Sequence, residues 1–210
     1  MRKSAASVKW VLGSLVSAAS LLAFTPSAQA ETFDQYKAEW QFAWDVYEFE
    51  SILPFDLRSQ VTVDLPIDIQ APIDHVYSVY SNLQNDVGRH PFLQGFITYA
   101  DYTQDGVEFI NFTALENVPA GPIVIPNKTQ AQQRKHPAEY LYYTDSWDLP
   151  NITTHQKVTF QDMGNGTTHV NEHITFLANP LLINFTATNG VSSHQAYQAA
   201  LKRDIENGTL

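Results

Sequence analysis

Residues 67–77 read IDIQAPIDHVY, and within this stretch the spacing of the apolar side chains changes from two residues to three or four. Over residues 59–69, apolar and polar residues alternate, which is the pattern of a strand with one buried face. Pro66 removes a backbone donor and therefore indicates an edge strand or a bulge. Pro72 then suits the first turn of a helix. An apolar stripe continues to Leu83, so the sequence predicts a strand that passes directly into a helix.

Downstream, alternating segments come in pairs that are separated by turn signals such as Gln104-Asp105-Gly106. The expected strands are 96–102, 107–114, 125–134, 139–147, 153–161 and 167–177. A final helix is predicted to begin near Ser192, because Ser192 and Gln195 have the spacing of a capping box. This order of elements predicts an α+β fold, in which one antiparallel sheet wraps around a long C-terminal helix.

The first thirty residues have the features of a cleaved export signal. Arg2, Lys3 and Lys9 give a positive start, an apolar stretch follows, and Ala28-Gln29-Ala30 places small residues where signal peptidase requires them. A membrane anchor is disfavoured because glycine and serine interrupt the apolar stretch, which is also short for a span. We therefore expect an exported protein, periplasmic or alternatively extracellular, with no stable membrane span after cleavage.

Composition excludes several classes of function. The chain has no cysteine, which removes thiol nucleophiles, thiolate zinc sites and iron–sulfur ligation. It has 12 basic and 22 acidic residues, and loss of the three signal-peptide bases would leave 9 against 22, a net charge of −13. Such a charge repels phosphate backbones, so nucleic acid is not an expected partner. Phosphate-binding loops, dinucleotide fingerprints and serine-hydrolase elbows are absent from the sequence.

Residues 31–57 form an aromatic N-terminal arm that precedes the domain of residues 58–210. Its aromatic residues are spaced three and four apart, which predicts a helix. The residues of this stripe are Phe33, Tyr36, Trp40, Trp44 and Tyr47. We expect the stripe to pack on the domain. The alternative is a lid, or a contact with a second copy or another partner.

Three stretches resemble the START-like superfamily, also called SRPBCC, which includes the polyketide cyclase/dehydrase and lipid-transport families. Residues 67–77 are similar to its passage from strand into helix, Arg89-His90-Pro91-Phe92 to its His-Pro after the first short helix, and residues 201–208 to the end of its long helix. The resemblance covers about residues 60–210 and leaves out the aromatic arm. It implies a deep cavity between the sheet and the C-terminal helix that holds lipids, sterols, polyketides or other apolar molecules.

Five residues are candidates for the lining of such a cavity. Tyr140 and Tyr142 are expected to share one face of a strand, where a tyrosine offers an apolar ring and a hydroxyl; ordinary sheet packing is the alternative. Tyr197 lies on the buried stripe of the final helix, and Asn111 lies among apolar residues of its strand. Glu172 alternates with apolar residues, so burial would raise its pKa and suit it to proton transfer, unless it forms a salt bridge at the rim.

No metal or cofactor is expected. His169 and His173 are four apart, but on a strand this spacing separates them by roughly 13 Å. His75 and His194 are expected on helices with exposed side chains. The favoured function is therefore an exported protein that binds a small apolar ligand. The alternatives are a cyclase or dehydratase that uses Glu172 or a cavity tyrosine, and an interaction domain that uses the aromatic arm.

Overall fold

The computed structural model describes residues 31–52, 56–149 and 151–210, and the predicted signal peptide lies outside them. The helices are α1 (Phe33–Ser51), α2 (Ile73–Tyr80) and α3 (Ile183–Glu206), with the short 3-10 turns η1 (Leu83–Asn85) and η2 (Pro137–Glu139). The strands are β1 (Ser59–Ile69), β2 (Leu93–Gln104), β3 (Val107–Ala120), β4 (Ile123–His136), β5 (Leu141–Asp148), β6 (Ile152–Asp162) and β7 (Thr168–Ala178). None of the helices described is both long and apolar enough to cross a membrane.

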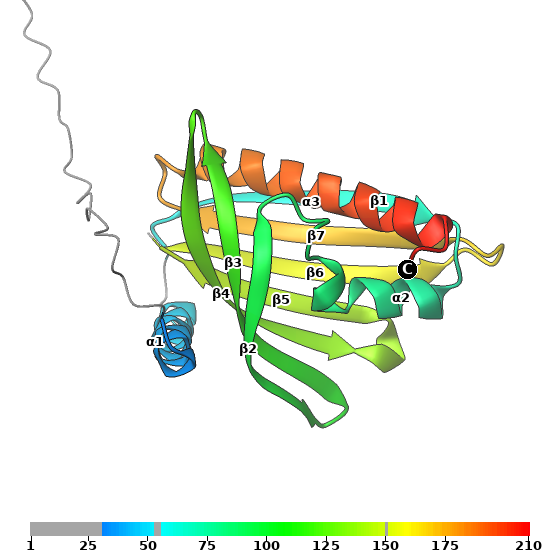
Figure 1. Cartoon of the computed structure of the whole chain (residues 1–210), viewed down its shortest axis with the longest axis horizontal. Helices are drawn as coiled ribbons and strands as arrows, with labels where there is room; N and C mark the ends of the chain where they lie inside the picture. The colour runs from blue at the N-terminus through cyan, green and yellow to red at the C-terminus, as the bar shows by residue number, and fades with distance from the viewer. Residues whose placement is uncertain (1–30, 53–55, 150) are drawn as a thin grey trace, which may run out of the picture. The chain divides into compact units, whose positions relative to one another are not determined.

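The seven strands form one antiparallel sheet in the order β1-β7-β6-β5-β4-β3-β2 (Figure 1). Strands β2 to β7 each pair with their neighbours in sequence, and β1 closes the order by pairing with β7 from Ser59↔Ala178 to Ile69↔Thr168. Strand β1 has a partner on one side only, so Pro66 sits on an edge strand as expected. The sheet and its C-terminal helix confirm the predicted α+β fold, a helix-grip arrangement in which an antiparallel sheet wraps around a long helix.

The passage from β1 into α2 occurs where the apolar periodicity changes. Pro72 precedes the helix in an extended conformation, and the hydroxyl of Thr168 on β7 donates to the carbonyl of Ala71 at 2.8 Å. The inner face of α2 then buries Val76 and Tyr80 in the main core. The hydrogen bond from Thr168 to Ala71 thus ties the β1–α2 connection to β7, the strand that pairs with β1.

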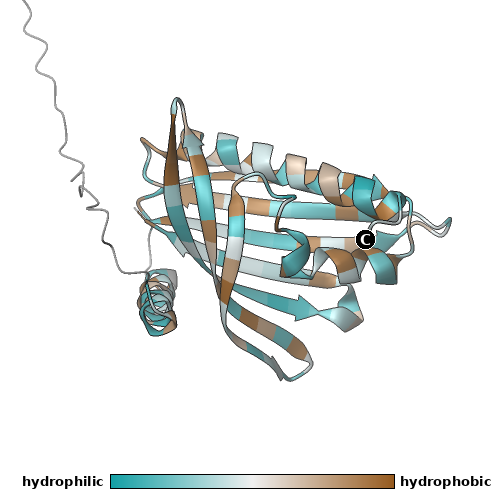
Figure 2. Cartoon of the chain, in the orientation of Figure 1, coloured by the Kyte–Doolittle hydropathy of each residue, from teal (hydrophilic) through white to brown (hydrophobic). Residues whose placement is uncertain are grey.

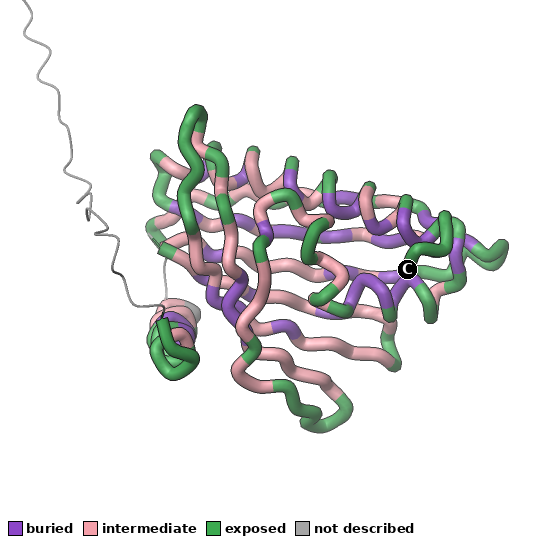
Figure 3. Tube along the Cα trace, in the orientation of Figure 1, coloured by how far each residue is buried: buried purple, intermediate pink, exposed green. Residues whose placement is uncertain are grey.

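Helix α3 lies along the sheet and packs on β1 and β7 (Figure 1). Its buried residues include Tyr197, Leu201 and Ile205, spaced by one helical turn. Figure 3 shows buried positions recurring along this helix. The amide of Gln198 donates to the carbonyl of Leu65 on β1 at 2.9 Å. Both apolar burial and this hydrogen bond therefore hold the helix on the sheet.

The predicted start of this helix was wrong, because α3 begins at Ile183 and Ser192 lies within it. The side chain and carbonyl of Asn179 accept hydrogen bonds from the amides of Leu181 and Ile183, which holds the chain at the first turn. Ile183 and Ala187 are buried against β1 and β7. Tertiary packing thus extends the helix through a segment whose threonine, asparagine and glycine residues have low helix propensity.

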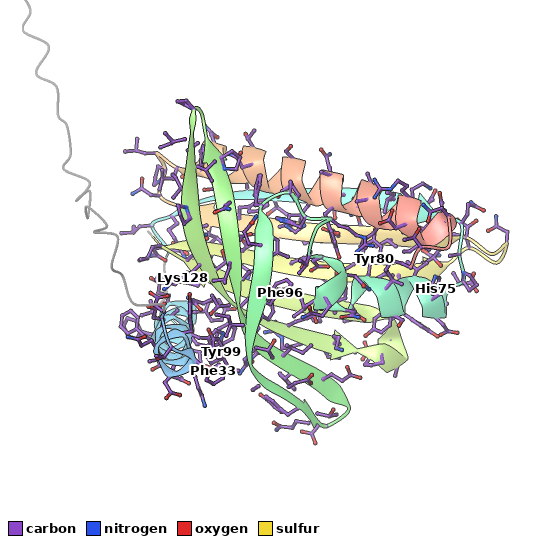
Figure 4. The ribbon with its side chains drawn as sticks, viewed as in Figure 1. Phe33, His75, Tyr80, Phe96, Tyr99 and Lys128 are labelled. Carbon is purple, nitrogen blue, oxygen red and sulfur yellow. The ribbon has the colours of Figure 1, made fainter. Side chains whose placement is uncertain are left out.

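Helix α1 contacts strands β2 to β5 through its aromatic stripe. Trp40 and Trp44 are 6% and 8% exposed and stack with ring centroids 5.3 Å apart. The indole N–H of Trp40 donates to the carbonyl of Ala131 at 2.9 Å. Phe33 at the start of the helix lies beside Tyr99 of β2, as Figure 4 shows. These contacts favour packing of the aromatic stripe over a free partner-binding arm.

Candidate ligand-binding cavity

A cavity of about 440 Å³ lies between the inner face of the sheet and α3. Alternate residues of β3 to β6 line it, such as Phe112, Ala114 and Glu116 on β3, because successive side chains point to opposite faces. Trp147 and its neighbour Asp145 on β5 consequently point to the other face, where α1 packs. The volume is in the range of cavities that bind small molecules.

One wall of the cavity is apolar and rich in phenylalanine. Phe96 on β2, labelled in Figure 4, meets Phe112 edge to face with ring centroids 5.2 Å apart. Phe176 on β7 packs directly on the backbone of α3 at Gly190, where an added Cβ would lie 2.5 Å from the ring. Figure 2 shows apolar and polar residues alternating along the strands that carry this wall. Further apolar lining residues are Leu83, Phe92, Leu93, Val118, Ile125, Leu149, Ile152, Leu182 and Phe185.

The hydroxyl of Tyr197 on α3 donates to Asp86, just after η1, at 2.6 Å. Burial raises the pKa of Asp86 to about 7, and the charge of Glu172 adds to the rise, while Tyr197, His194 and Arg89 oppose it. Burial also raises the pKa of Tyr197 well above its ordinary value, so its phenol stays protonated. Asp86 therefore gains or loses a proton near neutral pH.

Glu172 on β7 is fully buried and pairs with the imidazole of His194 on α3. Its Oε2 accepts from Nδ1 of His194 at 2.9 Å and from the amide of Gln156 at 3.3 Å, while Oε1 is buried without a partner. Burial lowers the pKa of His194, but the hydrogen bond and negative charge of Glu172 outweigh it and leave that pKa raised. The nearby His90 is different, because burial and His194 lower its pKa to about 3.

A second cluster with acidic side chains links β3, β4 and β5 through hydrogen bonds. The hydroxyl of Thr129 lies 2.7 Å from Oε2 of Glu116 and 3.2 Å from Oδ2 of Asp148. The amide nitrogen of Asn127 lies 2.9 Å from the same oxygen of Asp148 and 3.4 Å from that of Glu116. Burial raises the pKa of both carboxyl groups. The pKa of Asp148 rises to about 7, because the charge of Glu116 adds to the effect of burial.

The cavity is acidic and holds several polar atoms without partners. Among the described residues that line it, none is lysine or arginine. Seven buried side-chain polar atoms of the described chain have no hydrogen-bond partner, and four of them belong to lining residues. These four are Nδ1 of His90, Oε1 of Gln133, Oδ1 of Asp148 and Oγ1 of Thr186. Since buried polar groups are normally paired, these four atoms lack a partner that such groups ordinarily have.

The arrangement has counterparts among solved structures. A protein from Thermus thermophilus matches at 14% identity and TM-score 0.55 over 71% of this chain and 100% of its own. The ZhuI aromatase/cyclase of Streptomyces sp. R1128 matches at 12% identity and TM-score 0.53, over 70% of this chain and 96% of its own. A START superfamily protein from Mycobacterium smegmatis matches at 14% identity and TM-score 0.52, over 70% and 97%. The fold is START-like. Neither a protein-family model nor a curated protein matches the sequence.

Three of the predicted site residues lie at the START-like cavity. Tyr142 and Tyr197 line it directly. Glu172 is on the inner face of the sheet and is fully buried, so it does not lie at a solvent-exposed rim. It does not line the cavity itself but bonds to His194, which does.

The structure places Tyr140 and Asn111 outside the lining of this cavity. Tyr140 precedes β5 in a left-handed conformation (φ 48°), so the alternation expected from a strand does not include it, and its hydroxyl bonds to Asp74. Asn111 lies one position before Phe112 on β3 and so points to the opposite face, where it accepts from Gln132 at 3.0 Å.

Other polar cavity residues escaped sequence reasoning. His194 was expected to be exposed, but it lies three residues before Tyr197 on the same face of α3 and bonds to Glu172. Glu116 and Asp148 carry no local motif, and only strand alternation within the correct register places them together. His169 and His173 pair separately with Asp68 and Asp64. No group of three metal-ligating side chains occurs among residues 31–52, 56–149 and 151–210.

Proposed function

We propose that the protein is exported and binds a small, mainly apolar molecule with a polar end in the START-like cavity, without altering it. The observation that carries this proposal is a cavity with a phenylalanine-rich wall and four unpartnered polar atoms. Apolar area supplies affinity in such sites, while a few polar groups orient the ligand. The signal-peptide features of residues 1–30 support export.

A thermal-shift panel tests the binding proposal. Dodecanoic acid, cholesterol and anthraquinone represent a fatty acid, a sterol and a polycyclic aromatic. A ligand that binds only the folded state at 100 times its Kd stabilises by about 2.7 kcal/mol, so at least one class should raise Tm by several degrees. Thr154→Trp, which places an indole in the cavity, should reduce that shift. A panel without any effect on the Tm of the wild type contradicts the proposal.

A second candidate function is acid–base catalysis of the cyclase or dehydratase type, and the Glu172–His194 pair favours it. A carboxylate bonded to Nδ1 fixes the orientation of the imidazole, and His194 is the member of the pair that lines the cavity. His194 would thus exchange the proton with a bound molecule, and Glu172 would position it.

The state of His194 can be tested without knowing a substrate. In an NMR titration, we expect His194 to have a pKa above the ordinary value of about 6.5. Glu172→Gln removes the negative charge and keeps a hydrogen-bonding side chain, so burial should then lower the pKa of His194 below that of the wild type. An unchanged pKa of His194 in the variant would contradict the role given to Glu172.

A further inference from the structure

The acidic pair formed by Glu116 and Asp148 is short of hydrogen-bond donors. Among the residues that the structure describes, two donor side chains serve it: Thr129 has a single hydroxyl hydrogen, and the amide of Asn127 is directed at both carboxyl groups. Oδ1 of Asp148 is buried without any partner. Buried carboxylates are ordinarily stabilised by a cation or by several donors, and this pair has neither in full.

The groups that face the pair from other elements do not compensate for its charge. His194 on α3 is the basic group whose charge acts on Glu116, and it is already bonded to Glu172. The cavity wall described above contributes no lysine or arginine. Within the described part of the chain, therefore, the cavity lining presents an uncompensated acidic site.

Partly exposed apolar residues of the cavity lining flank the pair. Val118 and Ile125 continue the β3–β4 hairpin beyond it, and Leu149 follows Asp148. From α3, Phe185 completes this part of the lining. A charged group that reaches the pair would thus be attached to an apolar body in contact with the phenylalanine-rich wall.

We propose that Glu116 and Asp148 bind a protonated amine of the ligand, whose apolar body fills the rest of the cavity. This inference rests on the proposed binding function and names the chemical class of the ligand. An alkylammonium group has three N–H donors and one positive charge, which match the missing donors and the uncompensated charge. Charge-assisted hydrogen bonds of this kind are roughly twice as strong as neutral ones.

Three probes with the same alkyl chain separate the head group from the apolar body: octylamine, octanol and octanoate. Titration calorimetry on the wild-type chain should show octylamine binding about tenfold or more tightly than octanol, because hydrogen bonds to charged groups contribute at that level. Octanoate should bind most weakly, since its carboxylate would be repelled by the acidic side chains of Glu116 and Asp148. The octylamine affinity should also rise between pH 5.5 and 8, as Asp148 loses its proton.

The double variant Glu116→Gln/Asp148→Asn keeps the shape of the site and removes its charge. We expect it to lose about tenfold or more in octylamine affinity and to keep its octanol affinity within about twofold, which also shows that the cavity is intact. Asp101→Asn/Asp105→Asn removes two charges from exposed positions of β2 and its turn and should leave all three affinities unchanged.

Each alternative outcome is distinct. Equal affinities for octylamine and octanol, or an octylamine affinity that the double variant retains, would overturn the amine inference and leave the binding function in place. A rise in Tm with calcium chloride but not with octylamine, lost in the double variant, would overturn it in favour of a metal ion. If none of the three probes binds, the amine inference and the proposed function both fail.

Discussion

Replacing Trp40 by alanine is expected to lower the free energy of unfolding by about 3 to 5 kcal/mol, as truncation of a buried aromatic residue does. The indole is 6% exposed, stacks on Trp44 and donates to the carbonyl of Ala131. The variant loses the packing of α1 on the sheet and leaves that carbonyl without this donor. Urea unfolding followed by fluorescence measures the change.

Phe42→Ala is the matched control, because Phe42 lies on the same helix and is 67% exposed. Its loss should change the free energy of unfolding by no more than about 0.5 kcal/mol. If Trp40→Ala had as small an effect as Phe42→Ala, α1 would not be part of the packed domain. The hypothesis of a free partner-binding arm would then regain support.

Replacing Asp86 by asparagine is expected to stabilise the ligand-free protein at pH 8, by about 2 to 4 kcal/mol. The folded pKa of about 7 lies above the value of about 3.9 for an unfolded aspartate, so the folded state binds more protons between these values. Stability therefore falls as pH rises from about 4 to about 7, because burial opposes ionisation of the carboxyl group. Asparagine avoids this cost and can still accept from Tyr197.

The gain should shrink to about 0.5 kcal/mol near pH 4, where Asp86 is protonated in the folded state and about half protonated in the unfolded state. Urea unfolding at pH 4, 6 and 8 measures this trend. Asp105→Asn, in the exposed β2–β3 turn, should have little effect at any of these pH values. A gain for Asp86→Asn that does not vary with pH would show that ionisation of Asp86 is not its cause. The retention of destabilising carboxyl groups in the cavity is expected when they have a role in function.

The elements with regular periodicity were predictable from the sequence. Strand β1 and the passage into α2 follow from local patterns, and turn signals mark the β2–β3, β4–β5 and β6–β7 hairpins. The start of α3 was not predictable in this way. Burial of Ile183 and Ala187 against β1 and β7 holds its first turns, and these contacts join residues that are distant in sequence.

The cavity was predictable in kind but only partly in its residues. Tyr142 and Tyr197 were found because each lies on a buried face of a regular element. Asn111 was misplaced because apolar residues occupy both faces of β3, which leaves the inner face ambiguous. Glu116 and Asp148 come together only through the pairing of three strands, so no spacing within the sequence marks them.

Native mass spectrometry of the chain, purified without detergent, tests the binding account most directly. We expect the wild type to carry a small molecule at about one per chain and to lose it on gentle activation. The Thr154→Trp variant, purified in parallel, should carry markedly less of it. A wild type that appears only at the mass of the bare chain, also after incubation with a lipid extract, would contradict the account.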